Sequence, residues 1–449
     1  MQYKALPENG GALLFVRYFY TMNISSLYSL FLQNPSVQTD TRKLQPGDIF
    51  FALKGDQFNG NLFARQALEQ GAAWAVIDED VQPLHERFIR VPNALETLQQ
   101  LAGFHRSQLN IPFIAITGSN GKTTTKELIN AVLSKKYKVS TTVGNLNNHI
   151  GIPLTLLRVP RDTEIAVIEM GANHQKEIEG YCKYTRPTHG LITNAGKAHL
   201  EGFGGEEGVK KGKGELYDFL RAHEGTAFVM WDYPYLQKMS RGIAHIVTYG
   251  THNAQVTGTV NRSEPFLEVQ IGEGDAAFNI HSQLVGDYNL PNILAATCVA
   301  RYFKISDGDI QSAIAAYAPS NSRSQLMKKG SNQIILDAYN ANPSSMKAAI
   351  ENFAKLDGEK KMLLLGGMME LGKESEAEHR EIVSLIERYA WQQVALVGGD
   401  FLRISHPFLQ FNDSTEARDW LASHPPQHAT ILIKGSRSMK MENLLDAIS

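Results

Sequence analysis

The amino-acid sequence predicts an α/β protein in which short buried strands alternate with helices, and three observations carry that prediction. Residues 113–116 form an apolar run rich in β-branched side chains, as expected of a strand buried on both faces. A glycine turn at residues 118–121 follows directly, and apolar residues then recur at helical spacing. Similar short apolar runs alternate with helical segments along the chain. This alternation predicts a doubly wound, mostly parallel sheet with ligands at the carboxyl ends of its strands.

The length of 449 residues suggests about three domains. We expect an N-terminal extension over residues 1–21, followed by a small α/β domain over residues 22–105. A central domain is predicted over residues 106–318. A short polar linker with a proline separates it from a second α/β domain over residues 319–449.

Each predicted strand is a short apolar run bounded by turn residues. In chain order, the strands are residues 48–53, 73–77, 88–91, 113–117, 165–169, 190–193, 333–336, 362–365, 393–397 and 430–433. Helical spacing predicts helices that include residues 62–70, 290–303 and 377–389. Residues 226–280 contain short alternating runs, which we expect to form a β-rich insertion in the central domain.

Composition and charge are those of an ordinary globular protein. Hydrophobic residues make up 43% of the chain and charged residues 20%, and the net charge of −2 gives no broad attraction to nucleic acid or anionic membranes. Two cysteines, Cys182 and Cys298, are too few for a disulfide framework and suit a reducing cytoplasm. No run is long and apolar enough to span a membrane. The apolar residues 12–16 make a poor signal peptide because Arg17 interrupts them.

The stretch Gly118–Thr124 predicts a phosphate-binding loop. Its glycines allow backbone angles and a close approach that a side chain would prevent. Backbone amides and the following helix N-terminus then face negative charge, Lys122 reaches the outer phosphates, and Thr123 offers a hydroxyl to magnesium. Only Ser119 and Asn120 separate the glycines, where the common motif has four residues. An ordinary glycine turn is the alternative, and Gly-Lys-Thr-Thr at a strand-to-helix junction disfavours it.

Three further residues of the central domain are candidates for the same site. Glu169 closes an apolar strand and is well placed to bind magnesium opposite Thr123. His199 follows another predicted strand at the same edge of the sheet. Lys213 lies in a run of lysines and glycines, and spacing alone favours an exposed basic face there. In the first domain, the polar residues around Thr41 and Lys54 favour a solvated loop surface over a ligand site.

Several longer motifs resemble those of the Mur ligases, which are ATP-dependent amide-bond ligases of bacterial cell-wall synthesis. The motifs are residues 39–55, 117–126, 144–154, 169–172, 194–204, 337–343 and 434–439. The resemblance covers essentially everything after residue 22. It is closest to the members that join D-alanyl-D-alanine to a UDP-muramoyl-tripeptide.

The resemblance implies a UDP-binding first domain, an ATP-binding central domain and a Rossmann-like acceptor-binding domain at the C-terminus. ATP would phosphorylate the terminal carboxylate of the tripeptide, and the amine of the dipeptide would then displace phosphate. It further implies two magnesium ions, small-molecule substrates, and a bacterial cytoplasmic protein. A monomer is the default expectation. Meso-diaminopimelate and lysine both remain open as the third residue of the tripeptide.

The resemblance also implies roles for individual residues. The ATP contacts are Gly118, Ser119, Asn120, Gly121, Lys122, Thr123, Thr124, Asn292, Arg323 and Asp337. The metal ligands are Thr123, Glu169, His199 and Lys213, the last as a carbamate formed with carbon dioxide. The catalytic set is Lys122, Glu169, His199, Lys213 and Arg323. The substrate contacts are Thr41, Arg42, Lys54, Gly55, Asn147, Asn148, Asn340, Asn342 and Lys434.

Three positions depart from the family pattern. Ser322 stands where glycine is common, Tyr288 where histidine is frequent, and Gly367 where an acidic residue is common. The main alternative function is a Mur-type ligase that adds a single amino acid. The stretch 339–343 disfavours that alternative, because it lacks the arginine-containing motif of diamino-acid-adding members. Folate polyglutamylation, a small-metabolite kinase and a non-catalytic nucleotide-binding protein are more remote alternatives.

Overall fold

The computed structural model describes residues 22–274, 277–320 and 322–448, so the extension predicted at residues 1–21 lies outside the described part. Contacts divide the chain into two compact units. The first holds residues 22–110 together with Val143–Arg161 and Lys183–Arg186. The second holds Ile111–Thr142, Asp162–Cys182 and the chain from Pro187 onward. The mixed α/β class predicted from the sequence is confirmed, whereas the three-domain division stays a prediction.

The first unit is built on a small parallel sheet with the strand order β1-β2-β5-β6. Apolar runs form its inner strands, and Phe50, Ala52 and Ala75 pack in its core. The strands are β1 (Val37–Gln38), β2 (Ile49–Phe51), β3 (Lys54–Gly55), β4 (Phe58–Asn59), β5 (Trp74–Ile77) and β6 (Phe88–Arg90). The helices are α1 (Ile24–Gln33), η2 (Thr41–Lys43), η3 (Gly60–Phe63), α2 (Ala64–Glu69), α3 (Ala94–Ser107) and α5 (Gly151–Leu157).

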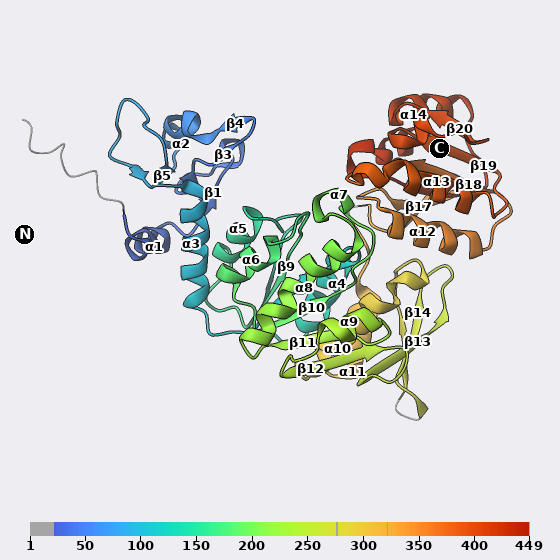
Figure 1. Cartoon of the computed structure of the whole chain (residues 1–449), viewed down its shortest axis with the longest axis horizontal. Helices are drawn as coiled ribbons and strands as arrows, with labels where there is room; N and C mark the ends of the chain where they lie inside the picture. Colours follow the sequence, from blue (N-terminus) through green and yellow to red (C-terminus); the bar gives the residue numbers. More distant parts are fainter. Residues whose placement is uncertain (1–21, 275–276, 321, 449) are drawn as a thin grey trace, which may run out of the picture. The chain divides into compact units, whose positions relative to one another are not determined.

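The second unit contains a nine-stranded sheet with the order β15-β14-β13-β12-β11-β10-β7-β9-β8. Its strands are β7 (Phe113–Thr117), β8 (Val139–Thr141), β9 (Ile165–Glu169), β10 (His189–Ile192), β11 (Thr226–Met230), β12 (His245–Gly250), β13 (Val256–Arg262), β14 (Glu268–Ile271) and β15 (Phe278–His281). Its helices are α4 (Lys122–Leu133), α6 (Glu177–Thr185, of which residues 183–185 belong to the first unit), α7 (Leu200–Phe203), α8 (Glu206–Ala222), α9 (Pro234–Met239), η5 (Asp287–Asn289), α10 (Leu290–Tyr302) and α11 (Asp307–Ala316). Helices α4 and α8 pack against strands β9 and β10 (Figure 1).

The expected β-rich insertion at residues 226–280 is wrong in part. Strands β11 and β12 pair in parallel with the central sheet and extend it, and only β13, β14 and β15 form an antiparallel extension. The error has a physical reason. Strand β12 is half-exposed over much of its length, so its sequence alternates like that of an antiparallel strand.

A six-stranded sheet completes the second unit, with the order β16-β17-β21-β18-β19-β20. Its strands are β16 (Gln325–Lys329), β17 (Asn332–Asp337), β18 (Lys361–Gly366), β19 (Gln393–Val397), β20 (Leu409–Phe411) and β21 (Thr430–Lys434). The helices are α12 (Pro343–Lys355), η6 (Gly372–Glu374), α13 (Ser375–Ile386), η7 (Gly399–Arg403), α14 (Ser414–Ser423), η8 (Arg437–Met439) and η9 (Met441–Ala447). Only β16 runs antiparallel to its neighbour, and Ile334, Leu364 and Ile431 lie in the core.

The sheet register decides where the candidate site lies. Strands β7, β9 and β10 are parallel neighbours, so their carboxyl ends meet at one edge of the sheet. The glycine loop follows β7, Glu169 ends β9, and the segment that carries His199 follows β10. The strand predictions 113–117, 165–169 and 190–193 are confirmed to within a residue. Across the described ranges, no helix has both the length and the apolar character needed to cross a membrane.

Candidate functional site

The glycine loop between β7 and α4 requires glycine at both ends. Gly118 has φ +145° and Gly121 has φ +79°, which are left-handed conformations that side chains disfavour. A Cβ at Gly118 would lie 1.9 Å from the Thr193 hydroxyl oxygen, and a Cβ at Gly121 would lie 2.5 Å from the Asn292 amide oxygen. The unusual backbone angles predicted for these two glycines are therefore confirmed, and a Cβ at either position would also collide with residues that surround the loop.

A residue that sequence reasoning did not single out holds the loop in place. The Ser119 amide donates to the Asn194 backbone oxygen at 2.9 Å, and the Asn120 amide donates to the Asn194 side-chain oxygen at 3.0 Å. Thr193 also donates to the Asn120 carbonyl at 2.6 Å. These two amides are thus engaged within the protein, and the ATP contacts of Ser119 and Asn120 stay predictions. The first-turn amides of α4 have no acceptor within the helix, and they supply the positive end for an anion. The position of Asn194, directly after a central strand, was the available signal.

Lys122 begins α4 and folds back over the loop. Its ammonium donates to the Gly118 carbonyl at 2.7 Å and to the Ser119 carbonyl at 3.2 Å. Burial lowers the pKa of Lys122, the Glu169 carboxylate opposes that shift, and the Arg323 guanidinium adds to it. The Glu169 carboxylate and the Arg323 guanidinium are therefore both close enough for their charges to act on Lys122. Thr123 and Thr124 lie in the same first turn of the helix.

Glu169 is buried at the end of β9, with 2% of its surface exposed. Its backbone amide donates to the Thr142 hydroxyl at 3.0 Å. The predicted magnesium ligands are the Glu169 carboxylate and the Thr123 hydroxyl. Both are oxygen donors, which Mg²⁺ prefers, so these residue types fit a magnesium ion. Among residues 22–274, 277–320 and 322–448, no group of three or more His, Cys, Asp or Glu side chains is arranged to hold a metal. The metal ligands named from the sequence therefore stay predictions.

Lys213 is buried in α8, so the exposed basic face favoured by spacing alone is wrong. Only 1% of its surface is exposed, and its ammonium donates to the Ala172 carbonyl at 2.9 Å. The ammonium also lies 4.7 Å from the centre of the Phe203 ring. Burial lowers the pKa of Lys213 well below its usual value, and the nearby Lys122 charge lowers it further. The helical spacing of Val209, Lys213 and Leu216, all buried, was the signal for an inward-facing lysine.

His199 makes a contact that the sequence did not indicate. Its Nδ1 atom pairs with the Glu370 carboxylate, which comes from the loop after β18. The hydrogen bond from His199 holds the pKa of Glu370 below its usual value. Two residues earlier, Lys197 donates to Glu378 at 2.6 Å. The segment after β10 is thus held at two points by residues of the C-terminal sheet region.

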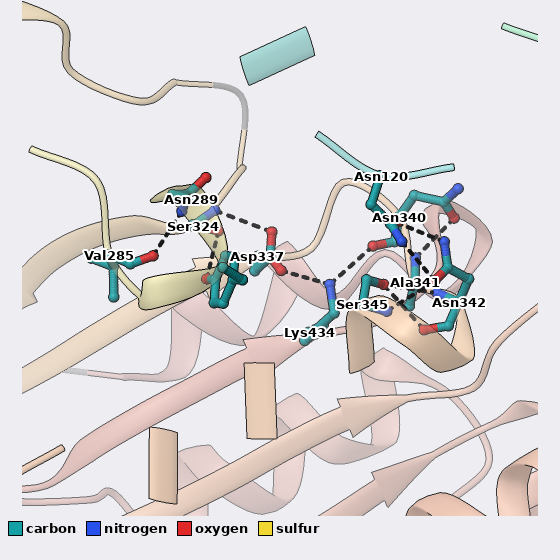
Figure 2. A network of polar contacts seen from close by, with 11 residues as sticks. Asn120, Val285, Asn289, Ser324, Asp337, Asn340, Ala341, Asn342, Ser345 and Lys434 are labelled. Carbon is teal, nitrogen blue, oxygen red and sulfur yellow. Dashed lines mark hydrogen bonds and ion pairs between the residues drawn. The ribbon is translucent and has the colours of Figure 1, made fainter. Parts of the chain in front are cut away.

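Polar contacts involve most of the remaining candidates of the second unit (Figure 2). The Asn342 side chain donates to the Asn120 side-chain oxygen at 2.8 Å, and the same residue caps α12. Lys434 donates to Asp337 at 2.6 Å and to the Asn340 carbonyl at 3.3 Å. Lys434 thus contacts Asp337 and Asn340, and Asn342, two residues further along the chain, contacts the glycine loop.

The linker residues at 322–324 make further contacts. Ser322 has φ +55°, a conformation that favours glycine, which gives a physical reason for the glycine expected there. The Arg323 guanidinium stacks 3.6 Å from the centre of the Tyr339 ring. Tyr288, found where histidine is frequent, bonds the Ser324 hydroxyl at 2.9 Å. Gly367 has no room for the expected acidic side chain, since a Cβ would lie 2.7 Å from the Gly399 Cα atom.

The candidates of the first unit are engaged with neighbours of their own. Arg42, beside Thr41 in η2, forms a two-pronged ion pair with Asp40. Lys54 pairs with Glu79 at 2.6 Å, and a Cβ at Gly55 would lie 2.7 Å from the Phe58 ring.

The asparagine pair before α5 also belongs to the first unit. The Asn148 side chain accepts hydrogen bonds from the amides of Ile150 and Gly151, at 3.1 and 2.8 Å, so it fixes the start of α5. Asn147 precedes it and is half-buried. Substrate contacts by these first-unit residues stay predictions.

The fold and the loop place this chain in a class, namely α/β proteins with a Gly-Lys-Thr loop between a central parallel strand and the next helix.

Family models match three stretches of the chain. They are the Mur ligase family catalytic domain at residues 35–106, the Mur ligase middle domain at 116–300, and the Mur ligase glutamate ligase domain at 322–437.

Individual proteins match over nearly the whole length. The UDP-N-acetylmuramoyl-tripeptide–D-alanyl-D-alanine ligase of Bacillus subtilis is 37% identical over 94% of this chain and 96% of its own. The crystal structure of MurF from Acinetobacter baumannii is 30% identical, covers 92% of both chains and has a TM-score of 0.84. MurF from Thermotoga maritima, solved in complex with ADP, is 26% identical, with a TM-score of 0.83 and coverage of 93% of this chain and 97% of its own. The chain belongs to the Mur ligase family.

Proposed function

We propose that this chain is an ATP-dependent ligase that joins D-alanyl-D-alanine to UDP-N-acetylmuramoyl-tripeptide in peptidoglycan precursor synthesis. The observation that carries the proposal is the glycine loop, held by Asn194 and followed by Lys122, in a chain that is 37% identical over 94% of its length to a ligase named for this reaction. ADP bound to the Thermotoga maritima relative supports ATP as the nucleotide.

The nucleotide would lie at the edge of the central sheet where the carboxyl ends of β7, β9 and β10 meet. Gly118, Gly121 and the first turn of α4 leave space and amide donors for the phosphates. Lys122 sits over the loop carbonyls, from which a phosphate can draw it. Asn292 packs against Gly121, the Arg323 charge acts on Lys122, and Asp337 pairs with Lys434. We assign these residues to ATP binding.

Magnesium would be held at two positions, the first by Thr123 and Glu169 and the second by His199 and carbamylated Lys213. When bound, the ions neutralise charge on the transferred phosphoryl group. Burial favours the neutral amine of Lys213, which is the form that reacts with carbon dioxide. Reaction at Nζ forms a carbamate and releases a proton, so the lysine becomes an anion. Its neighbour Lys122 then has a negative partner, which removes the repulsion between the two lysines.

The reaction follows from the weak electrophilicity of a carboxylate. One carboxylate oxygen of the tripeptide attacks the γ-phosphorus of ATP, the bond to ADP breaks, and an acyl phosphate forms. Lys122 and Arg323 offset the negative charge that gathers there. The dipeptide amine attacks the acyl carbon, loses a proton, and phosphate leaves with one of the original carboxylate oxygens. The residues Thr41, Arg42, Lys54, Gly55, Asn147 and Asn148 would bind the UDP-muramoyl substrate, and Asn340, Asn342 and Lys434 the acceptor side.

A bacterial cytoplasmic location and a monomeric state are part of the proposal. The relatives' substrates are nucleotide-activated small molecules, and the net charge of −2 suits a protein with no nucleic-acid partner. Sedimentation of the purified chain tests the monomer. A mass of 49.8 kDa is expected across the micromolar range, and a mass of twice that value would contradict it.

The test of the proposed function is phosphate release from ATP with UDP-muramoyl-tripeptide and a series of acceptors. We expect release with D-alanyl-D-alanine and none above background with diaminopimelate, lysine or no acceptor. Release with a single amino acid on a shorter precursor would favour the alternative ligase. Lys122→Met should abolish release, whereas Lys135→Met, at an exposed lysine just beyond α4, should leave it unchanged.

A further inference from the structure

The contact between His199 and Glu370 decides which ring nitrogen of His199 carries a proton and which has a free lone pair. Glu370 Oε2 lies against His199 Nδ1. An ionised carboxylate has no proton to give, so Nδ1 carries the proton and donates. A neutral imidazole with its proton on Nδ1 has its lone pair on Nε2. The pair therefore sets the tautomer of His199.

Both partners adopt an unusual backbone conformation. His199 has φ +52° and Glu370 has φ +62°, which are left-handed values that non-glycine residues seldom adopt. The Glu201 amide donates to the Glu370 carbonyl at 3.3 Å, so the two backbones also contact each other. The two strained residues thus lie where the two loops meet, and the contacts between these loops hold them in this conformation.

The loop that carries His199 has a second anchor on the same side. The Lys197 ammonium lies 2.6 Å from Glu378, whose side chain is 9% exposed. The Lys197 amide donates to the Ser344 hydroxyl at 3.0 Å. The loop is therefore held at Lys197, and the contact with Glu370 restrains the side chain of His199 two residues later.

We propose that Glu370 is a positioning residue that holds His199 with its proton on Nδ1 and leaves Nε2 as the nitrogen that can accept a divalent metal ion. The inference rests on the proposed function, in which His199 is a ligand of the second ion. A histidine that binds a metal through one nitrogen commonly donates the other to a carboxylate, which raises its affinity for the ion. In the loop after β18, Glu370 is the residue whose carboxylate meets His199.

The test measures Mn²⁺ binding to the full chain in the presence of saturating ADP, by the loss of the free-ion signal in electron paramagnetic resonance. The variants are Glu370→Ala, Glu370→Gln and His199→Ala. The control is Glu376→Gln, which breaks an exposed pair with Arg380 on α13. We expect Glu370→Ala to lower the affinity for the second Mn²⁺ ion about 10- to 100-fold. Glu370→Gln should weaken it less, because the amide oxygen still accepts from Nδ1. The control should bind both ions as the unaltered chain does.

A double variant separates positioning from a general loss of structure. Glu370→Ala in the His199→Ala background should cause no further loss of Mn²⁺, since its effect acts through His199. An additive loss would overturn the inference, and so would Glu370 variants that bind like the control while His199→Ala is weakened. If His199→Ala itself retains the second ion, the proposed metal role of His199 fails and the inference fails with it. Should Glu370→Ala not fold, Glu370→Gln and its double variant carry the same comparison.

Discussion

The Lys434 ammonium lies 2.6 Å from the Asp337 carboxylate, and the two residues are direct partners on the adjacent parallel strands β21 and β17. Only 2% of the Lys434 side chain is exposed, and Asp337 also accepts from the Ser324 amide at 3.1 Å. The pair therefore ties the end of the C-terminal sheet to the linker that carries Arg323.

Removal of one partner of this pair should be costly. We expect Lys434→Met to lower the free energy of unfolding by about 3 kcal/mol, because it leaves the partly buried Asp337 carboxylate without its cation. Urea unfolding at neutral pH measures the change. The control is Lys138→Met, which breaks an exposed pair with Asp162 and should cost less than about 1 kcal/mol. Equal effects of the two variants would contradict the importance assigned to the buried pair.

The shape of the glycine loop predicts that Gly121→Ala weakens nucleotide binding. The added Cβ would lie 2.5 Å from the Asn292 amide oxygen and would also strain a residue at φ +79°. We expect the dissociation constant of ADP, measured by calorimetry, to rise about tenfold or more, which corresponds to about 1.4 kcal/mol. Gly180→Ala is the matched control, because a Cβ there meets nothing within 4 Å. Unchanged ADP binding by Gly121→Ala would argue against phosphate binding at this loop.

The proposed carbamate on Lys213 predicts that ligase activity needs a negative charge at this position. Lys213→Ala should lose most of the ligase activity, because it removes both the amine and the carbamate formed on it. Short carboxylic acids added to this variant should restore part of the activity, since they return a carboxylate to the buried position that the side chain leaves. Lys211→Ala, at an exposed lysine of the same helix, should keep full activity without rescue. Full activity in Lys213→Ala would remove the carbamate from the account.

His189 predicts a loss of stability in mild acid. Burial lowers its pKa from 6.5 to about 4, so the unfolded chain binds a proton in this range that the folded chain does not. The stability that the neutral imidazole contributes is fully present above pH 6.5 and is lost as the pH falls toward 4. At pH 5 the free energy of unfolding should be lower by about 2 kcal/mol than at neutral pH. Urea unfolding at pH 7.5 and pH 5 measures it.

The variant His189→Gln should show a correspondingly smaller difference between the two pH values. His223→Gln, at an exposed histidine, should keep the full difference. A difference that is the same in His189→Gln and in the unaltered chain would assign the acid sensitivity to other groups.

Local patterns in the sequence were sufficient for the elements that build the site. Phe113–Thr117 and Ile165–Glu169 are continuous apolar runs because parallel strands are buried on both faces. Gly118 and Gly121 were identifiable because few other residues tolerate their backbone angles. The inward face of α8 was also readable from its helical spacing, although the surrounding lysines and glycines favoured an exposed reading of Lys213.

Contacts between distant segments were not predictable from local pattern. His199 and Glu370 are separated by 171 positions, and nothing near either residue indicates the other. Asn194 accepts hydrogen bonds from the Ser119 and Asn120 amides only because β10 pairs with β7. This pairing is a property of the strand order and not of either strand alone. The sequence thus supplied the residue types of the site, and tertiary pairing decided which of them meet.

The most direct measurement of the central claim uses a tripeptide substrate labelled with ¹⁸O in its terminal carboxylate. The purified chain is given ATP and D-alanyl-D-alanine, and both products are analysed by mass spectrometry. The account predicts a UDP-muramoyl product extended by the dipeptide and one ¹⁸O atom in the released phosphate. Phosphate without the label, or a product extended by a single amino acid or not at all, would contradict it.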